Sequence, residues 1–161
     1  MLVPMSFAWY ACDMSAAPLF DDIPSAPPML DRVAVEQARL VRLARDYLAA
    51  NELSIDYDGL AEGRASTVLA ARQWVKRQRG AGRLFVVDYG GRSLIPSFQL
   101  DEVFDLDERV IGAVESLVMF GMNGWAIWQW FTSENPWINA RPIEVIGTDE
   151  LAVAVDQLVN G

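Results

Sequence analysis

The stretch of sequence that decides the fold runs from Ser66 to Pro96 and reads STVLAARQWVKRQRGAGRLFVVDYGGRSLIP. Its first half contains no helix breaker, and Ser66 or Thr67 can cap a helix that continues to about Arg79. The following Gly80-Ala-Gly82 ends such a helix. This half therefore predicts a capped helix over residues 67–79.

The second half of the stretch has the pattern of a β-hairpin. Arg83 to Tyr89 is rich in β-branched and aromatic residues, and Arg92 to Ile95 forms the returning run. Gly90 and Gly91 supply the two positive-φ positions of a tight hairpin turn, and Pro96 stops the second strand. A helix, a turn, a second helix and then a hairpin is the order found in winged helix-turn-helix proteins, and this stretch supplies the second helix and the hairpin.

Upstream of this stretch, the sequence predicts one long helix and one turn. Asp31 can cap a helix from Arg32 to about Ala50, and Gly59 to Gly63 is typical of a turn. Residues 1–30 contain five prolines and predict an irregular arm. The apolar residues of the long helix recur at helical spacing and predict a scaffold helix with one apolar face: Val33, Leu40, Val41, Ala44, Tyr47 and Leu48.

Residues 101–161 predict a small helical bundle. Trp125 to Phe131 has the character of a short aromatic helix, and Thr148 can cap a last helix. We therefore expect a mostly α fold with a small β-hairpin, in which 1–30 is the arm, 31–100 a helix-turn-helix-like region and 101–161 a helical domain. A further apolar stripe predicts the first helix of the bundle: Val110, Ile111, Val114, Leu117 and Val118.

The composition excludes most catalytic and metal sites. The 161-residue chain has no histidine and one cysteine, Cys12, so histidine-dependent triads, zinc sites with imidazole ligands and disulfides are ruled out. There is no glycine-rich phosphate loop, and the carboxylates from Asp101 to Glu108 lack the spacing of a calcium loop. We expect a non-enzymatic protein without a metal or a cofactor.

The sequence also gives an expectation about cellular location. Met1 to Cys12 contains Pro4 and lacks the Lys/Arg-rich start of an export signal. The apolar run from Gly112 to Phe131 includes Glu115 and is broken by Gly121-Met-Asn-Gly124, so it does not predict a spanning helix. We expect a cytoplasmic protein that does not associate with a membrane.

Charge is segregated along the chain, whose net charge is −9. Residues 63–100 carry 7 basic and 1 acidic side chains, whereas residues 1–62 carry 4 and 10 and residues 101–161 carry 2 and 11. Because DNA phosphates favour Lys and Arg, the basic centre predicts contact with operator DNA, and a solvated basic face is the alternative.

The predicted helix of residues 67–79 carries most of this basic centre. Thr67 would cap the turn that faces DNA, and Trp74 and Val75 would point to the core. Base edges are predicted to be reached by Arg72, Gln73 and Lys76. Phosphates are predicted to be contacted by Arg77, Arg79 and Arg83.

Aromatic residues are concentrated near the carboxyl terminus. Four of the six tryptophans lie between Trp125 and Trp137. At helical spacing, Trp125 and Trp128 share one face and Trp130 lies on another, so we expect one face to meet a partner subunit. A cofactor pocket is the alternative, although no phosphate loop accompanies it.

Taken in order from Leu60 to Val159, several short motifs resemble those of antitoxins of the Xre/MbcA/ParS group, which partner RES-domain and related toxins. The resemblance covers about 100 of the 161 residues. It rests on these pieces: Gly82-Arg-Leu-Phe85, Gly91-Arg92, Ile95-Pro-Ser-Phe-Gln-Leu-Asp101, Gly124-Trp-Ala-Ile-Trp128, Asn135-Pro136, Arg141-Pro142 and Val153 to Val159.

The resemblance implies a type II antitoxin that occludes the active site of a toxin and represses its own operon through DNA binding. It would act as a homodimer or as a hetero-oligomer with the toxin. A stand-alone winged-helix transcriptional regulator is the alternative function, and a structural role is the alternative for Arg141. The resemblance implies toxin contacts at Trp130, Asn135, Trp137, Asn139, Arg141 and Leu158.

Overall fold

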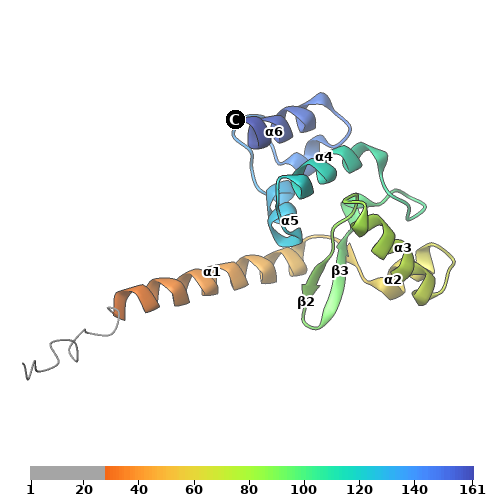
Figure 1. Ribbon diagram of the computed structural model, residues 1–161, viewed down its shortest axis with the longest axis horizontal. Helices are drawn as coiled ribbons and strands as arrows, with labels where there is room; N and C mark the ends of the chain where they lie inside the picture. Colours follow the sequence, from red (N-terminus) through yellow and green to blue (C-terminus); the bar gives the residue numbers. More distant parts are fainter. Residues whose placement is uncertain (1–27) are drawn as a thin grey trace, which may run out of the picture. The chain divides into compact units, whose positions relative to one another are not determined.

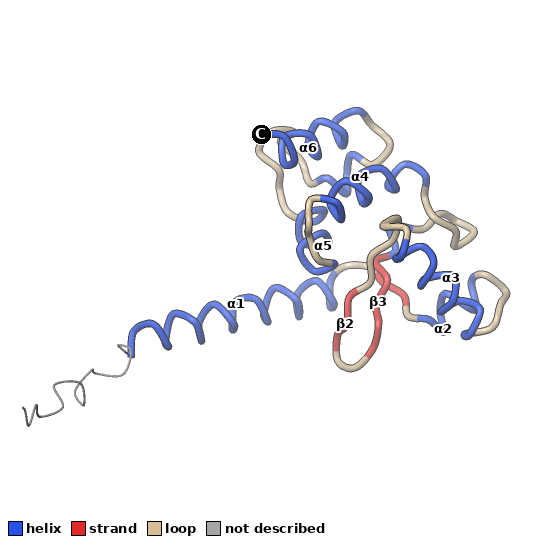
Figure 2. The backbone as a smooth tube through the Cα atoms, viewed as in Figure 1, coloured by secondary structure: helices blue, strands red, loops and turns tan. Residues whose placement is uncertain are grey.

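The computed structural model describes the backbone of residues 28–161 and the side chains of residues 32–161. The described residues are mostly helical with one small antiparallel sheet, which confirms the expected fold class (Figures 1 and 2). None of the described helices combines the length and apolar character needed to cross a bilayer. The elements are α1 Pro28–Asn51, β1 Ser54–Ile55, α2 Tyr57–Gly63, α3 Val68–Gly80, β2 Val87–Tyr89, β3 Arg92–Pro96, α4 Glu108–Met119, α5 Gly124–Thr132 and α6 Asp149–Asn160, with 3-10 turns at Ser97–Gln99 and Pro142–Val145.

The chain divides into two compact units between Arg39 and Leu40, within α1. The helix-turn-helix region and the carboxyl-terminal helices both lie in the second unit, residues 40–161. Most of the arm predicted over residues 1–30 lies outside the described residues. Its last three positions are the first of α1, so the expectation of an irregular chain to residue 30 and of an Asp31 cap is wrong. Proline is favoured in the first turn of a helix, where its missing N–H is not needed, and this accounts for a start at Pro28.

The helix-turn-helix pairs two helices that differ from the pair predicted. The stretch from Gly59 to Gly63, expected to be a turn, belongs to α2, and the turn follows it, with Ala65 at a φ of +50°. Asp56 caps α2 by accepting a hydrogen bond from the Gly59 N–H at 2.9 Å, while Leu60 is fully buried. The cap and the burial together outweigh the low helix propensity of two glycines.

The hairpin confirms the predicted turn and corrects the start of its first strand. Gly90 and Gly91 have φ values of +57° and +76°, and β2 pairs with β3 antiparallel. The strand begins at Val87, not at Arg83, because the buried side chain of Gln99 takes both backbone groups of Phe85, with N···O distances of 2.9 and 3.0 Å. The Gln99 side chain thus makes the hydrogen bonds to Phe85 that a neighbouring strand would otherwise make.

The sheet contains a third strand that the sequence did not indicate. β1 pairs with β3 through Ser54 opposite Pro96 and Ile55 opposite Ile95, so the strand order is β1-β3-β2. A strand of two residues shows no alternating pattern that could predict it.

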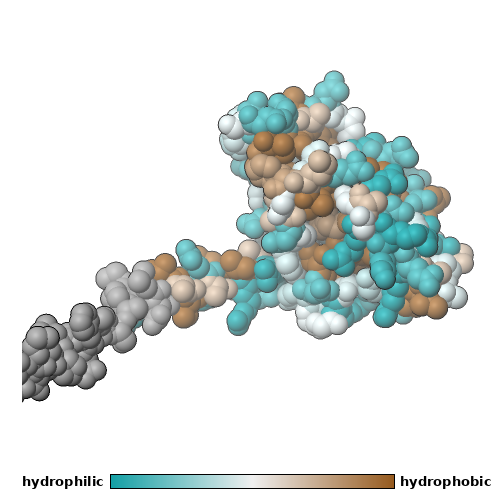
Figure 3. All heavy atoms as spheres, viewed as in Figure 1, coloured by the Kyte–Doolittle hydropathy of each residue, from teal (hydrophilic) through white to brown (hydrophobic). Residues whose placement is uncertain are grey.

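The apolar face of α1 is not buried as predicted for a scaffold helix. Within the part of α1 that belongs to the second unit, Leu48 is 6% exposed, whereas Leu40, Val41 and Tyr47 are 56%, 49% and 63% exposed. Hydrophobic residues are accordingly visible along α1 in Figure 3. Periodicity predicts a helix with two unlike faces but does not say whether a neighbour covers the apolar one.

Two hydrophobic clusters form the core of the second unit. The first joins α2 and α3 to Ile95 and Leu106, and the second joins α4, α5 and α6 to Leu48, Phe85 and Val87. Residues from both sides of position 100 occur in each cluster, because Leu48, Phe85 and Val87 pack with the carboxyl-terminal helices and Leu106 packs with α2 and α3. The hairpin therefore connects the two cores within one compact unit.

The predicted carboxyl-terminal helices are present as α4, α5 and α6. Thr148 occupies the position before α6, but its hydroxyl donates to the Val145 carbonyl at 2.8 Å and does not cap the helix. In α5, Trp128 is fully buried and Trp125 stacks on it at 5.6 Å, while Trp130 packs edge-on against Phe131. Trp125 also packs edge-on against Tyr89, and both Trp125 and Trp130 pack against the second hydrophobic cluster, so each has a neighbour within the chain; contact with a partner subunit stays a prediction.

Candidate nucleic-acid interface

The helix-turn-helix presents one face of α3 to solvent. Thr67 caps the helix as predicted by accepting a hydrogen bond from the Ala70 N–H at 3.2 Å. Ala71, Trp74 and Val75 are buried against the first hydrophobic cluster, also as predicted for the last two. On the face shown in Figure 3, hydrophilic residues predominate over the α2–α3 region.

The side of α3 opposite the buried residues forms a ridge that we call the outward ridge, made of Leu69, Gln73 and Lys76. These residues are four and three positions apart, so they lie in one row along the helix, and all three are exposed. Arg72 and Arg79 flank the ridge on one side and Arg77 on the other. Leu69 was not among the residues predicted for this face, although its position four residues before Gln73 places it on the same side of a helix.

The cations of α3 differ from most other cations of the chain in lacking carboxylate partners. Among the described residues, no carboxylate oxygen lies within 4.0 Å of Arg72, Lys76, Arg77 or Arg79. The Arg72 guanidinium carbon lies 5.2 Å from the centre of the Tyr57 ring, which lies at the start of α2. The outward side of α3 therefore carries positive charge that the described residues do not neutralise.

Arg83, the sixth predicted DNA contact, lies apart from this face. It is half-buried, and its Nε is 3.7 Å from a carboxylate oxygen of Glu115 in α4. The residue follows the end of α3, where the chain turns at Gly82 towards the second hydrophobic cluster. The structure thus places Arg83 against α4 and not beside Lys76.

Arg64 and Gly63 fix the turn that leads into α3. The Arg64 guanidinium lies 4.2 Å from the centre of the Trp74 ring and donates to the Phe104 carbonyl at 2.7 Å. A Cβ at Gly63 would come within 2.5 Å of the Phe104 ring, so only glycine fits without displacement. These contacts hold the helix-turn-helix against the loop that precedes α4.

The hairpin is anchored to its neighbours. Arg92 forms an ion pair with Asp56, the cap of α2. The pKa of the Asp56 carboxyl is lowered most by the hydrogen bond from the Gly59 N–H and next by the hydrogen bond from Arg92. The Tyr89 hydroxyl donates to Asp46 of α1 at 2.9 Å, and this hydrogen bond raises the pKa of Tyr89. Since Arg92 is the one cation of the hairpin, the hairpin adds no unpaired positive charge to the face of α3.

The residues implied as toxin contacts are divided between structural and exposed positions. Asn135 is buried and accepts a hydrogen bond from the Trp137 N–H at 3.0 Å. The Arg141 side chain pairs with Glu144 at 2.9 Å and Glu52 at 3.8 Å, so its partners within the chain are carboxylates and not the loop carbonyls that its structural alternative expects. The Arg141 hydrogen bonds lower the pKa of Glu144.

The other four implied toxin contacts lie in two places. Trp137 is 59% exposed and Asn139 is exposed with a φ of +50°, both in the loop closed by the pairing of Asn135 with Ala140. Trp130 and Leu158 are half-buried and pack against the second hydrophobic cluster. Within this set, Trp137 and Asn139 are therefore the residues most accessible to a partner.

The acidic segment between Asp101 and Glu108 is organised by hydrogen bonds of its own. Asp101 accepts from the N–H groups of Val103 and Asp105, both at 2.9 Å. Asp107 caps α4, and the side chain of Arg109 lowers its pKa. Among the described residues, no group of three potential ligands gathers closely enough to hold a metal ion.

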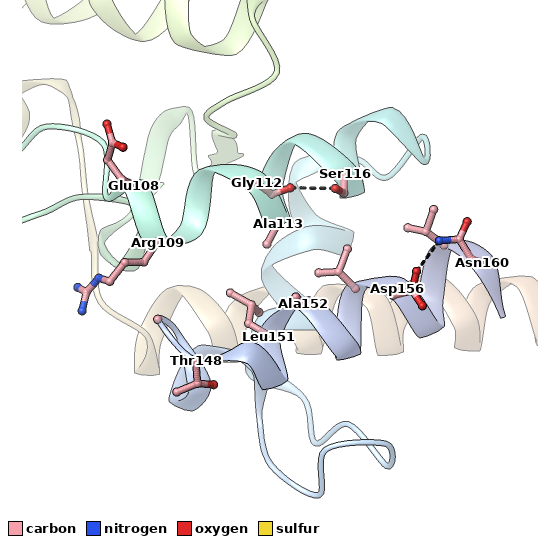
Figure 4. A pocket seen from close by; sticks show the side chains of 13 residues that line it. Glu108, Arg109, Gly112, Ala113, Ser116, Thr148, Leu151, Ala152, Asp156 and Asn160 are labelled. Carbon is pink, nitrogen blue, oxygen red and sulfur yellow. Dashed lines mark hydrogen bonds between the residues drawn. The ribbon is translucent and has the colours of Figure 1, made fainter.

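A groove of about 440 Å³ separates α4 from α6 (Figure 4). Its floor is apolar, with Ala113 on α4 and Leu151 on α6. The side chains of Ser116 and Asn160 hydrogen bond along their own helices, to the Gly112 carbonyl and to Asp156. Ligand pockets combine an apolar lining with convergent polar groups. Because the Ser116 and Asn160 side chains already hydrogen bond within their own helices, we do not consider the groove a candidate active site.

Comparison with known proteins shows a likeness to a solved structure. No family model matches the chain, and no curated protein matches it. The NMR structure of the protein Rv2175c resembles the present structure with a TM-score of 0.53 at 20% sequence identity, over 66% of this chain and 79% of that chain. At this identity the likeness shows a shared fold alone.

Proposed function

We propose that the chain is a non-enzymatic DNA-binding protein of the winged helix-turn-helix type, which contacts duplex DNA through α3. One observation carries the proposal: in a chain of net charge −9, the outward side of α3 bears four cations without carboxylate partners among the described residues. If these cations were paired with carboxylates, the alternative of an ordinary solvated surface would be favoured over DNA binding. Left free, they suit the phosphates of a duplex.

The proposed contacts divide by position on α3. Gln73 and Lys76 on the outward ridge would reach base edges in the major groove, where an amide pairs with adenine and a cation with guanine. Arg72, which the sequence predicted to reach base edges, flanks the ridge and would lie on phosphates together with Arg77 and Arg79. The strong negative charge of the rest of the chain would weaken binding to DNA in any other orientation.

The test is binding of the full chain to duplexes selected from a random-sequence pool, measured by fluorescence anisotropy. Lys76→Glu is expected to weaken binding by about 10-fold to 100-fold, the value of one base contact. Binding by the wild-type chain is expected to fall steeply with salt, and Arg77→Glu to reduce the slope of that dependence by about one counterion.

Arg42→Glu is the matched control. Arg42 is an exposed arginine of α1 with no carboxylate within 4.0 Å among the described residues, so its reversal changes the net charge equally. It is expected to change affinity by less than about twofold, since Arg42 lies on α1 and not on the helix proposed to contact DNA. Equal losses for Arg42→Glu and Lys76→Glu would mean that net charge alone governs binding, and no selected duplex at all would overturn the proposal.

A second candidate function, neutralisation of a toxin, is favoured by the exposure of Trp137. A tryptophan that is 59% exposed is the type of residue that dominates protein interfaces. This proposal otherwise rests on the sequence resemblance. It is tested by co-expressing the chain with the product of a neighbouring gene. Growth rescue by the wild-type chain and its loss in Trp137→Ala, with DNA affinity unchanged, would support it; a harmless neighbour that does not co-purify would count against it.

A further inference from the structure

Leu69 is an exposed apolar residue on a face otherwise made of polar and basic side chains. It is the second residue of α3, directly after the Thr67 cap and Val68, and it is 67% exposed. The preceding Val68 packs against the first hydrophobic cluster, but Leu69 belongs to neither cluster. Its side chain thus has no role in the core of the described structure.

The position of Leu69 places it among the residues best situated to reach DNA. In helix-turn-helix proteins the amino-terminal residues of the second helix contact base edges. Leu69 precedes Gln73 and Lys76 on the outward ridge, and the rise of about 1.5 Å per residue puts its Cα about 6 Å from that of Gln73 along the helix axis. With a base-pair spacing of about 3.4 Å, the two side chains would face bases about two steps apart.

The chemistry of the major groove leaves few partners for a leucine. The base edges there present hydrogen-bond donors and acceptors, with one apolar exception, the C5-methyl group of thymine. A leucine pressed against a donor or an acceptor would desolvate that group without offering a hydrogen bond, which is unfavourable. Contact with a methyl group removes apolar surface from water on both sides.

We propose that Leu69 is a specificity-determining residue that contacts the C5-methyl group of a thymine, about two base pairs from an adenine bound by Gln73. The inference rests on the proposed function and deepens it, because it assigns to the protein thymine-containing sites in which a methyl contact adds to the hydrogen bonds with bases. The arginines on the flanks of the ridge supply affinity for any duplex, and Leu69 adds a methyl contact to the base contacts of Gln73 and Lys76.

The experiment replaces the methyl group alone. In the best duplex selected from the random pool, each thymine is changed in turn to deoxyuridine, which retains every hydrogen-bonding group and lacks only the C5-methyl group. The wild-type chain is expected to lose about fourfold in affinity at one position, the value of one buried methyl-sized group. Leu69→Ala is expected to bind the thymine and deoxyuridine duplexes equally well.

Leu53→Ala is the matched control, because Leu53 is 82% exposed and lies outside α3. It is expected to keep the full discrimination between thymine and deoxyuridine. Thermal unfolding of the Leu69→Ala chain is expected to match that of the wild type, since the side chain is not buried.

The outcomes separate this inference from the proposed function. If a selected duplex is bound and Lys76→Glu weakens it, but no deoxyuridine position matters or Leu69→Ala retains the discrimination, the role of Leu69 is overturned and DNA binding stands. If the wild-type chain selects no duplex, both proposals fail.

Discussion

α1 and α3 both carry several arginines and an apolar stripe at helical spacing, yet they place that stripe differently. α3 buries Ala71, Trp74 and Val75, whereas the part of α1 in the second unit buries Leu48 and leaves Leu40 and Tyr47 exposed. An amphipathic sequence specifies a helix and two unlike faces in both cases. Only the neighbours, α2 and the Arg64 turn for α3, decide which apolar face becomes core.

The comparison also shows that an unpaired cation is not by itself a sign of DNA binding. Arg42 of α1 has no carboxylate within 4.0 Å among the described residues, and the Arg45 guanidinium lies 5.3 Å from the centre of the Trp125 ring. The cations of α3 differ because the buried side of that helix holds them on one fixed, outward surface. A fixed array of charges loses less conformational entropy when it binds a fixed array of phosphates.

The largest effect is expected at Trp74, whose burial orients α3. Trp74→Ala removes a side chain that is 8% exposed together with its contact to Arg64, and should lower the free energy of unfolding by about 3–5 kcal/mol. Urea denaturation measures the change. Trp137→Ala removes the same side chain from an exposed site and should cost less than about 0.5 kcal/mol. Similar losses for the two variants would contradict the burial of α3.

A smaller effect is expected at Asp56, which caps α2 and pairs with Arg92. Asp56→Ala should cost about 1 kcal/mol through loss of the cap. The pKa of Asp56 is lowered in the folded chain, so its contribution is complete above the unfolded value of about 3.9 and is lost as the pH falls through the lower folded value.

Asp56→Asn is the control for the pH dependence, because asparagine also caps helices but does not carry the charge that pairs with Arg92. The difference in unfolding free energy between the wild type and this variant should shrink towards zero as the pH is lowered below about 4. A difference that is independent of pH would mean that the carboxylate charge does not stabilise the hairpin.

The smallest effect is expected on α1. Leu40, on the apolar stripe of α1, is 56% exposed, so Leu40→Asp should change the unfolding free energy by less than about 0.5 kcal/mol at low protein concentration. Denaturation curves at two protein concentrations measure this. A loss above about 2 kcal/mol would contradict the exposure of the apolar side of α1, because it would show that this side is covered in solution.

Several parts of the fold were predictable because they depend on neighbouring residues alone. The cap at Thr67, the end of α3 before Gly82 and the positive-φ pair Gly90 and Gly91 are local features, and the structure confirms each. The carboxyl-terminal helices were equally evident from their apolar stripes. In the candidate interface, the exposed positions of Arg72, Gln73, Lys76, Arg77 and Arg79 followed from the same helical periodicity.

Other features depended on residues far apart in the sequence and were decided by tertiary structure. Gln99 hydrogen bonds Phe85 where the strand was expected to begin, and Arg83 pairs with Glu115 of α4 rather than lying beside Lys76. The sequence by itself determined where α3, the hairpin turn and the carboxyl-terminal helices form, since local hydrogen bonds and propensities set them. Which faces are buried, which cations stay unpaired and which leucine faces outward were decided only when the chain packed, because burial and ion pairing require a partner whose position local sequence does not encode.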